Sequence, residues 1–267
     1  MSEKVVVITG ASSVIGAALA RQLGPKHHKL VLAARRDREL NQIADQAKTK
    51  TLVVVTDVTK RSDVERLRDQ ALKEFGHVDV WVNNAGRGNR KRVLELSDHD
   101  LDEMINVNLR SVLYGMQVIV PHFQERREGH LINVSSFLGR VPWATHRTAY
   151  SAAKAATNIL TANLRMDLKP EYPNIHVSLL LPGIVDSPFQ DTAGTPLKSG
   201  AGTQLGPFTI QSAEEVASYI VALMDHPLPE VYTSPILAEL ARRYSQDVSA
   251  VEASFVGPPL SKRESGE

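Results

Sequence analysis

The amino-terminal stretch constrains the fold most, because it joins a buried strand to a helix through a glycine turn. Lys4 to Thr9 reads KVVVIT, a short apolar run typical of a strand buried on both faces. Gly10 opens the turn, and Val14 to Ala20 has the composition of a helix. This layout presents backbone N–H groups and a helix amino terminus to a pyrophosphate, although a plain tight turn would have the same pattern.

Further apolar runs follow along the chain, and helical segments separate them. Alternating strands and helices predict a sheet of parallel strands with helices on both faces. We therefore expect one doubly wound α/β domain over residues 1–256, with a mostly parallel seven-stranded sheet whose strand order reverses near the first strand, and a polar tail at 257–267. The six further strands are predicted at 29–34, 50–56, 78–82, 129–134, 174–181 and 230–234.

Composition narrows the class of protein. The chain has 267 residues, 42% of them hydrophobic, which is enough for one sizeable core. A net charge of +1 indicates no overall attraction to nucleic acid or to an anionic membrane. With no cysteine, disulfides, thiolate metal sites and a cysteine nucleophile are excluded, and we expect no metal site. The sequence has no signal-peptide pattern and no membrane-spanning run, so we expect a cytoplasmic protein.

A tyrosine and a lysine lie four positions apart in a run of helix-forming residues. Tyr150 and Lys154 should therefore share one face of a helix. A free phenol titrates near ~10, and a neighbouring positive charge lowers its pKa. Such a tyrosine could protonate an alkoxide or deprotonate an alcohol. By itself the spacing also fits a half-buried tyrosine beside a solvated lysine.

Several motifs in order along the chain resemble the short-chain dehydrogenase/reductase family. The turn TGASSVIG is similar to the family's TGxxxGxG, NNAG at 83–86 follows the fourth predicted strand, and the PG at 182–183 is similar to the start of PGxVxT. One position departs, because Val14 stands where the family has its middle glycine, and a β-branched residue tolerates positive φ poorly. The resemblance covers 4–234 and implies reversible hydride transfer between a nicotinamide cofactor and a carbonyl or secondary alcohol.

The resemblance implies roles for four side chains. Tyr150 is the expected general acid/base, and Lys154 is expected to lower its pKa and bind the nicotinamide ribose. Ser136 is expected to polarise the substrate carbonyl, with Ser135 as the alternative. Tyr150 follows Ser136 by 14 positions, one more than is usual in the family. Asn108 is expected at a helix kink, where it would order a water of the proton relay.

The end of the second predicted strand bears on the choice of cofactor. Arg35 and Arg36 stand where a carboxylate would hold the ribose hydroxyls of NAD. Because a guanidinium suits the 2′-phosphate of NADP, we expect NADP(H), with Arg35 as the better contact. Both arginines could instead begin a solvated helix. The resemblance assigns the cofactor these further contacts: Gly10, Ser12, Ser13, Ile15, Asp57, Val58, Asn84, Ala85, Gly86, Tyr150, Lys154, Pro182, Gly183, Val185 and Ser187.

The identity of the small-molecule substrate does not follow from the sequence. The resemblance implies a substrate lid at about 186–211, a segment rich in Gly, Thr, Ser and Pro. Trp143, His146 and Arg147 could line the pocket or face solvent. The basic run at 87–92 could hold an acidic substrate, a cofactor phosphate or an acyl carrier protein, or could be a solvated loop.

Two other functions are compatible with the sequence. Val14 and the longer segment between Ser136 and Tyr150 would suit a dinucleotide-binding sensor or scaffold with little turnover. A 3-oxoacyl reductase acting on carrier-linked substrates would give the basic run a partner. The resemblance also implies a homodimer or homotetramer that packs through the long helices before Gln124 and around Tyr150.

Overall fold

A sheet of seven parallel strands forms the centre of the computed structural model, which describes residues 3–187, 200–206 and 208–255. The strands are β1 (Val5–Thr9), β2 (Lys29–Ala34), β3 (Thr51–Val55), β4 (Val80–Asn83), β5 (Gly129–Val134), β6 (Ile175–Leu181) and β9 (Glu230–Tyr232). Their order is β3-β2-β1-β4-β5-β6-β9, which reverses between β1 and β4. The prediction of a seven-stranded doubly wound sheet is therefore confirmed.

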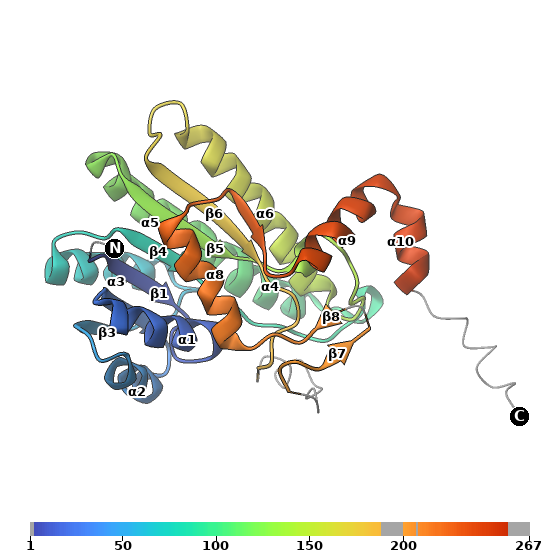
Figure 1. The fold of residues 1–267 in the computed structure, drawn as a ribbon, viewed down its shortest axis with the longest axis horizontal. Helices are drawn as coiled ribbons and strands as arrows, with labels where there is room; N and C mark the ends of the chain where they lie inside the picture. The colour runs from blue at the N-terminus through green and yellow to red at the C-terminus, as the bar shows by residue number, and fades with distance from the viewer. Residues whose placement is uncertain (1–2, 188–199, 207, 256–267) are drawn as a thin grey trace, which may run out of the picture.

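Helices cover both faces of this sheet (Figure 1). One layer holds α1 (Val14–Leu23), α2 (Asp37–Ala47) and α8 (Ala213–Asp225), and the other holds α3 (Arg61–Phe75), α5 (Ser111–Arg126) and α6 (Thr148–Leu168).

The alternation of side chains along β1 explains why two layers form. Val6 and Ile8 belong to the core under the first helix layer, and Val5 and Val7 belong to the core under the second. Successive residues of a strand point to opposite faces, so a strand with helices on both sides needs apolar residues throughout. All four side chains are at most 1% exposed, and burying each contributes roughly 1.5–3 kcal/mol.

A π-helical turn interrupts the helix around Asn108, where the sequence analysis expected a kink. α4 (Asp98–Ile105) begins at a capping box in which Ser97 and Asp100 bond each other's backbone N–H groups. The π-helical turn spans Asn106–Arg110, and α5 continues from it. A π turn holds an extra residue, and here it buries Asn108 completely.

The carboxyl-terminal part differs from the expectation in detail. After β9 come two helices, α9 (Pro235–Gln246) and α10 (Val248–Phe255), and the sequence analysis did not place α10. Within the expected lid, β7 (Gln204–Leu205) and β8 (Phe208–Thr209) form a short antiparallel hairpin. The rest of the expected lid at 188–199 and the expected tail at 257–267 lie outside the described residues. Among the described helices, none has the length and apolarity needed to cross a membrane.

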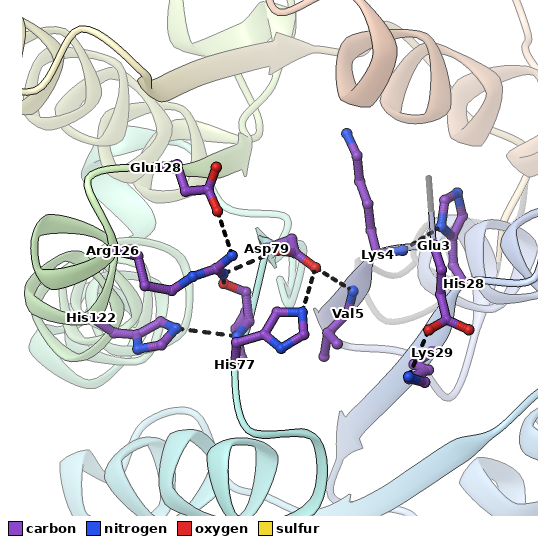
Figure 2. Close-up of polar contacts among 11 residues, drawn as sticks. Glu3, Lys4, Val5, His28, Lys29, His77, Asp79, His122, Arg126 and Glu128 are labelled. Carbon is purple, nitrogen blue, oxygen red and sulfur yellow. Dashed lines mark hydrogen bonds and ion pairs between the residues drawn. The ribbon is translucent and has the colours of Figure 1, made fainter. Parts of the chain in front are cut away.

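A polar network at the amino ends of the strands ties β1, β4 and α5 together (Figure 2). The Asp79 carboxylate accepts the Val5 N–H at 2.7 Å and lies 3.0 Å from the Arg126 guanidinium. His77 contacts the same carboxylate at 3.2 Å, and His122 accepts the N–H of Val78 at 3.2 Å. This end of the sheet is cross-linked by side chains, whereas the opposite, carboxyl end borders a large cavity.

Candidate active site

A cavity of about 1050 Å³ runs along the carboxyl ends of the strands, across the point where the strand order reverses. Arg35, at the end of β2, lines one part of it, and Tyr150, on α6, lines another. Every side chain that the sequence assigned to catalysis or to the cofactor lines this cavity, with the exception of Asn108. The structure therefore brings together residues that lie far apart in the sequence, and their roles stay predictions.

The glycine turn and the NNAG segment form one hydrogen-bonded unit. Gly10 has φ +67°, and a Cβ atom there would lie 2.8 Å from the Cα atom of Ala85, so only glycine fits. The Asn84 amide donates to the Thr9 carbonyl at 2.9 Å. The Thr9 hydroxyl accepts the N–H groups of Asn84 and Ala85 at 3.0 and 3.1 Å. The NNAG segment thus fixes the turn that borders the cavity.

The amino terminus of α1 has the features of a pyrophosphate site. Ser13 is the N-cap residue, but its hydroxyl makes no capping hydrogen bond. The N-cap side chain therefore leaves the N–H groups of the first turn unbonded, and these groups carry the positive end of the helix dipole. Ser12 and Ile15 line the cavity beside them. This donor set fits the pyrophosphate of a nicotinamide dinucleotide.

Val14 is the first residue of α1 and adopts a left-handed conformation, with φ +50°. The sequence suggested this conflict, because the family has a glycine here. A left-handed conformation costs a residue with a Cβ atom roughly 1–2 kcal/mol, and β-branching adds to the crowding. The Val14 side chain also lines the cavity. The turn therefore keeps the shape that glycine would give it, at a cost in stability.

Replacing Val14 with glycine should raise the free energy of unfolding by about 1 kcal/mol, because the release of strain outweighs the added freedom of the unfolded chain. Val14→Ala is the matched variant, since it removes the branched side chain but keeps the Cβ atom and hence most of the strain. Urea denaturation at neutral pH measures both. A Val14→Gly protein less stable than Val14→Ala would contradict this account.

The two arginines after β2 differ in their contacts. Arg36 donates to the Ser12 hydroxyl at 2.9 Å and lies 3.9 Å from the Glu39 carboxylate. The Arg35 side chain is exposed and makes no hydrogen bond or ion pair within the described residues. Both line the cavity. Arg36 is therefore already tied to the glycine turn, and Arg35 is the guanidinium available to a phosphate.

Tyr150 is buried, and burial is the main influence on its titration. Burial raises the pKa of the Tyr150 phenol, while a hydrogen bond with Ser136 and the charge of Arg147 act in the opposite direction. The expected lowering of this pKa by Lys154 is not the net result, because burial outweighs the influences that lower it. The Lys154 ammonium lies 5.7 Å from the centre of the Tyr150 ring and donates to the Val134 carbonyl at 2.9 Å.

Burial also affects the lysine itself. Lys154 is 3% exposed, and burial lowers its pKa to about 8. The ammonium is therefore still mostly charged at neutral pH, and its contact with the Val134 carbonyl fixes it beside the Tyr150 ring.

The two serines that follow β5 have different environments. The Ser135 hydroxyl is turned toward α6, where it bonds the Asn158 side chain and the Lys154 carbonyl. The Ser136 hydroxyl accepts the Leu138 N–H at 3.2 Å and is hydrogen-bonded to Tyr150. Of the two, Ser136 is thus the one placed beside the tyrosine, and the longer spacing between them does not separate the pair.

Asn108 lies behind the cavity wall. Its side-chain amide donates to the Arg87 carbonyl at 2.8 Å and to the Met104 carbonyl at 3.1 Å, and its oxygen accepts the Arg87 N–H at 3.1 Å. Its backbone carbonyl accepts the Thr157 hydroxyl at 3.0 Å. Asn108 therefore holds the loop after Gly86 against α6, and the predicted role in ordering a water stays a prediction.

The segment after β6 closes another side of the cavity. The Gly183 N–H donates to the Thr233 hydroxyl at 3.4 Å, and the Pro182 carbonyl accepts the Phe137 N–H at 2.9 Å. Val185 forms an isolated bridge with Gln211. These contacts hold the PG segment between β5 and β9, and Ser187 lines the cavity beyond it.

The wall beyond Tyr150 includes residues that sequence reasoning missed or left open. Trp143, His146 and Arg147, which could have faced solvent, all line the cavity. Leu205 and Phe208 belong to the hairpin within the expected lid, whereas Leu237 of α9 was not predicted. The sequence signal for the hairpin was a pair of apolar residues, Leu205 and Phe208, inside a polar, glycine-rich segment. No group of three or more metal-binding side chains occurs within the described part of the chain.

Comparisons with known proteins agree with this arrangement. A family model described as short chain dehydrogenase matches residues 4–197, which is most of the chain. The chain belongs to the short-chain dehydrogenase family. An uncharacterized oxidoreductase of Staphylococcus epidermidis is 33% identical to it over 227 residues, which cover 85% of this chain and 93% of that protein.

Solved structures of other short-chain dehydrogenases have the same fold. An alcohol dehydrogenase from the archaeon Thermococcus sibiricus, complexed with 5-hydroxy-NADP, is 29% identical with a TM-score of 0.74, covering 86% of this chain and 96% of that one. A short-chain dehydrogenase/reductase from Burkholderia phymatum, in complex with NAD, is 26% identical with a TM-score of 0.83, covering 97% and 98%. The protein is therefore an oxidoreductase of a family that binds nicotinamide dinucleotides, and these two relatives hold different ones.

Proposed function

We propose that this short-chain dehydrogenase transfers a hydride between NADP(H) and a carbonyl or secondary alcohol, with Tyr150 as the general acid/base. The observation that carries the proposal is the grouping of Tyr150, Ser136 and Lys154 in the buried wall of one cavity. The same cavity extends past the amino terminus of α1 to Arg35. Its donors match the parts of a dinucleotide, and its buried hydroxyls match a carbonyl oxygen.

The raised pKa of Tyr150 suits proton donation in the reducing direction. A phenol that stays protonated at neutral pH can give its proton to a carbonyl oxygen as that oxygen becomes negative. Ser136 would hold the same oxygen by a hydrogen bond, which places it within reach of the phenol. The cofactor, when bound, supplies the hydride. The phenolate that remains is stabilised by the hydrogen bond with Ser136 and by the positive charge of Arg147.

Two further residues would position these groups. The Lys154 ammonium can reach a ribose hydroxyl while it keeps its contact with the Val134 carbonyl. Asn108 fixes the backbone of Arg87, and hence the loop that closes the cavity beside Gly86. In the proposed relay, a water near Asn108 would return the proton to Tyr150 from solvent.

Arg35 is proposed as the residue that favours NADPH over NADH. Replacing Arg35 with alanine should weaken NADPH binding about tenfold and leave NADH binding unchanged, because only NADPH carries the 2′-phosphate. The loss of NADPH affinity should not be larger, because Arg35 is exposed and salt screens an exposed charge pair. Fluorescence titration of both cofactors measures it. Arg38, which is exposed in the first turn of α2, is the matched control, and an equal loss of NADH affinity in Arg35→Ala would contradict the assignment.

The proposed activity itself is tested with the purified protein. NADPH oxidation is followed against a panel of ketones and aldehydes, after titration with NADPH and NADH. Binding of NADPH together with turnover of at least one carbonyl is the expected result. Failure of both cofactors to bind would overturn the proposal, since the mechanism depends on one of them.

Val14 supports a second candidate, a dinucleotide-binding sensor with little turnover. Its strained conformation lies in the turn that should receive the pyrophosphate, and its side chain lines the cavity. If Val14 impairs the turn, Val14→Gly should bind NADPH more tightly than the wild type. Unchanged NADPH affinity in Val14→Gly would remove the structural observation on which the sensor function rests.

A further inference from the structure

The wall of the cavity beside Tyr150 carries two arginines from separate segments. Lys91 and Arg147 form an isolated parallel bridge, so the basic run after Gly86 lies against the segment that precedes α6. This pairing brings Arg90 and Arg147 to the same end of the cavity, and both line it. Arg147 also acts on Tyr150 through its charge. The two guanidiniums therefore lie where a substrate, rather than the pyrophosphate of a cofactor, would bind.

Two of the four basic residues at this end are paired with acids on α4. Arg87 pairs with Glu103 at 2.5 Å, and Lys91 pairs with Asp100 at 2.8 Å. In contrast, no ion pair involves Arg90 within the described residues. The remaining acid on the wall is Asp102, which lies exposed on α4.

Arg147 differs from Arg90 in being buried. It is 6% exposed, and its charge acts on Tyr150. Its guanidinium stays charged in a protein interior, because its pKa is far above neutral. A charged group that is mostly removed from water attracts an anion more strongly than an exposed one, since less water screens it.

Another part of the lining is apolar and aromatic. The rings of Trp143 and Phe208 are in edge contact with centroids 4.6 Å apart, and Phe137 lies 5.7 Å from Phe208. Leu237 of α9 packs in the same cluster. All four line the cavity. The lining of the cavity therefore combines cationic residues with an apolar cluster.

We propose that the substrate is a carbonyl compound with an apolar or aromatic body and a carboxylate, which Arg90 and Arg147 hold beside Tyr150. This inference rests on the proposed function and specifies its substrate class. A guanidinium binds a carboxylate through two parallel hydrogen bonds, so the pair would fix the substrate's orientation as well as its affinity. Trp143 and Phe208 would cover the apolar part of the substrate.

Binding of an unreactive probe tests the carboxylate site without turnover. The probes are 3-phenylpropanoate and its uncharged match, 3-phenylpropanamide, titrated by calorimetry into the full protein with saturating NADPH. The wild type should bind the acid between about 10-fold and 100-fold more tightly than the amide. Arg90→Gln and, separately, Arg147→Gln should abolish this preference with little effect on the amide. Arg92→Gln is the matched control, since Arg92 belongs to the same run but does not line the cavity.

Equal binding of acid and amide by the wild type would overturn the inference, and so would an equal loss of both probes in Arg90→Gln. Because Arg147 is buried, Arg147→Gln could fail to fold, and exposed Arg90 keeps the test decisive in that case. Loss of the acid preference in Arg92→Gln alone would indicate long-range attraction by the exposed run and would also overturn it.

Turnover separates this inference from the proposed function. The substrates are 4-oxo-4-phenylbutanoate and its methyl ester, which differ in one charge. Faster reduction of the acid in kcat/KM, lost in Arg90→Gln, supports both proposals. Reduction of the ester as fast as the acid overturns the carboxylate site and leaves the reductase in place. Reduction of no carbonyl compound overturns the function, while the probe titration still decides whether the anion site exists.

Discussion

Replacing Tyr150 with phenylalanine is expected to lower kcat for carbonyl reduction by about 10²- to 10⁴-fold, with NADPH affinity unchanged. Phenylalanine keeps the ring and its packing but removes the only proton that the mechanism transfers to substrate. The Ser136 hydroxyl would lose one partner and keep the Leu138 N–H that it already accepts. The loss should therefore appear in kcat and kcat/KM together, because the missing interaction exists only in the transition state.

Tyr172→Phe is the matched control for this prediction. Tyr172 lies beyond the end of α6, where the Arg127 guanidinium lies 5.4 Å from the centre of its ring, and it does not line the cavity. Tyr172→Phe also removes a tyrosine hydroxyl, but it should leave kcat unchanged. A Tyr150→Phe protein that kept a tenth of the wild-type kcat would mean that another group donates the proton, and Ser136→Ala would then be the next variant to measure.

The fold could be predicted because its main signals are local. An unbroken apolar run such as Val5–Thr9 indicates a strand covered on both faces, and Gly10 marks the turn whatever the rest of the chain does. The reversal of strand order near the first strand was expected from the connection rules for doubly wound sheets, whereas the full order comes from the structure. α10 was missed because its eight residues carry little periodic signal, and its single buried residue is Val251.

The candidate site could be predicted only where one motif carries it. The turn, the NNAG segment and the pair Tyr150 and Lys154 each lie within a few consecutive residues, and each contributes residues to the cavity lining. The apolar wall is different, because Phe208 meets Trp143 only after the hairpin folds over the segment before α6. The direction of the Tyr150 pKa also escaped the sequence, since spacing shows which charge is near but not how deeply the phenol is buried.

A buried histidine that does not line the cavity should make the free energy of unfolding depend on pH. His130 on β5 is 5% exposed, and its Nε2 atom lies 2.8 Å from the Ser178 hydroxyl oxygen. Ser178 donates its own proton to the Leu228 carbonyl at 2.6 Å, so its oxygen must accept from His130. This assigns the neutral tautomer that carries its proton on Nε2. Protonation would have to occur on Nδ1, which is buried and has no hydrogen-bond partner within the described residues.

Burial and the nearby His176 and Lys4 lower the pKa of His130 from 6.5 to about 3. The unfolded chain therefore binds a proton at a higher pH than the folded one. The contribution to stability is complete above pH 6.5 and is lost progressively as the pH falls toward 3. At pH 5 the loss should reach about 2 kcal/mol from this histidine alone, which is roughly a 30-fold shift in the folding equilibrium.

His130→Gln isolates this effect, because glutamine offers an N–H to Ser178 and does not titrate. Between pH 7.5 and pH 5, the wild type should lose about 2 kcal/mol more unfolding free energy than His130→Gln, measured by urea denaturation at each pH. His226→Gln is the matched control, since His226 is exposed at the end of α8, and it should follow the wild type. Equal losses in wild type and His130→Gln would mean that water or a structural rearrangement reaches Nδ1 at low pH, and the buried neutral histidine would then not govern the acid response.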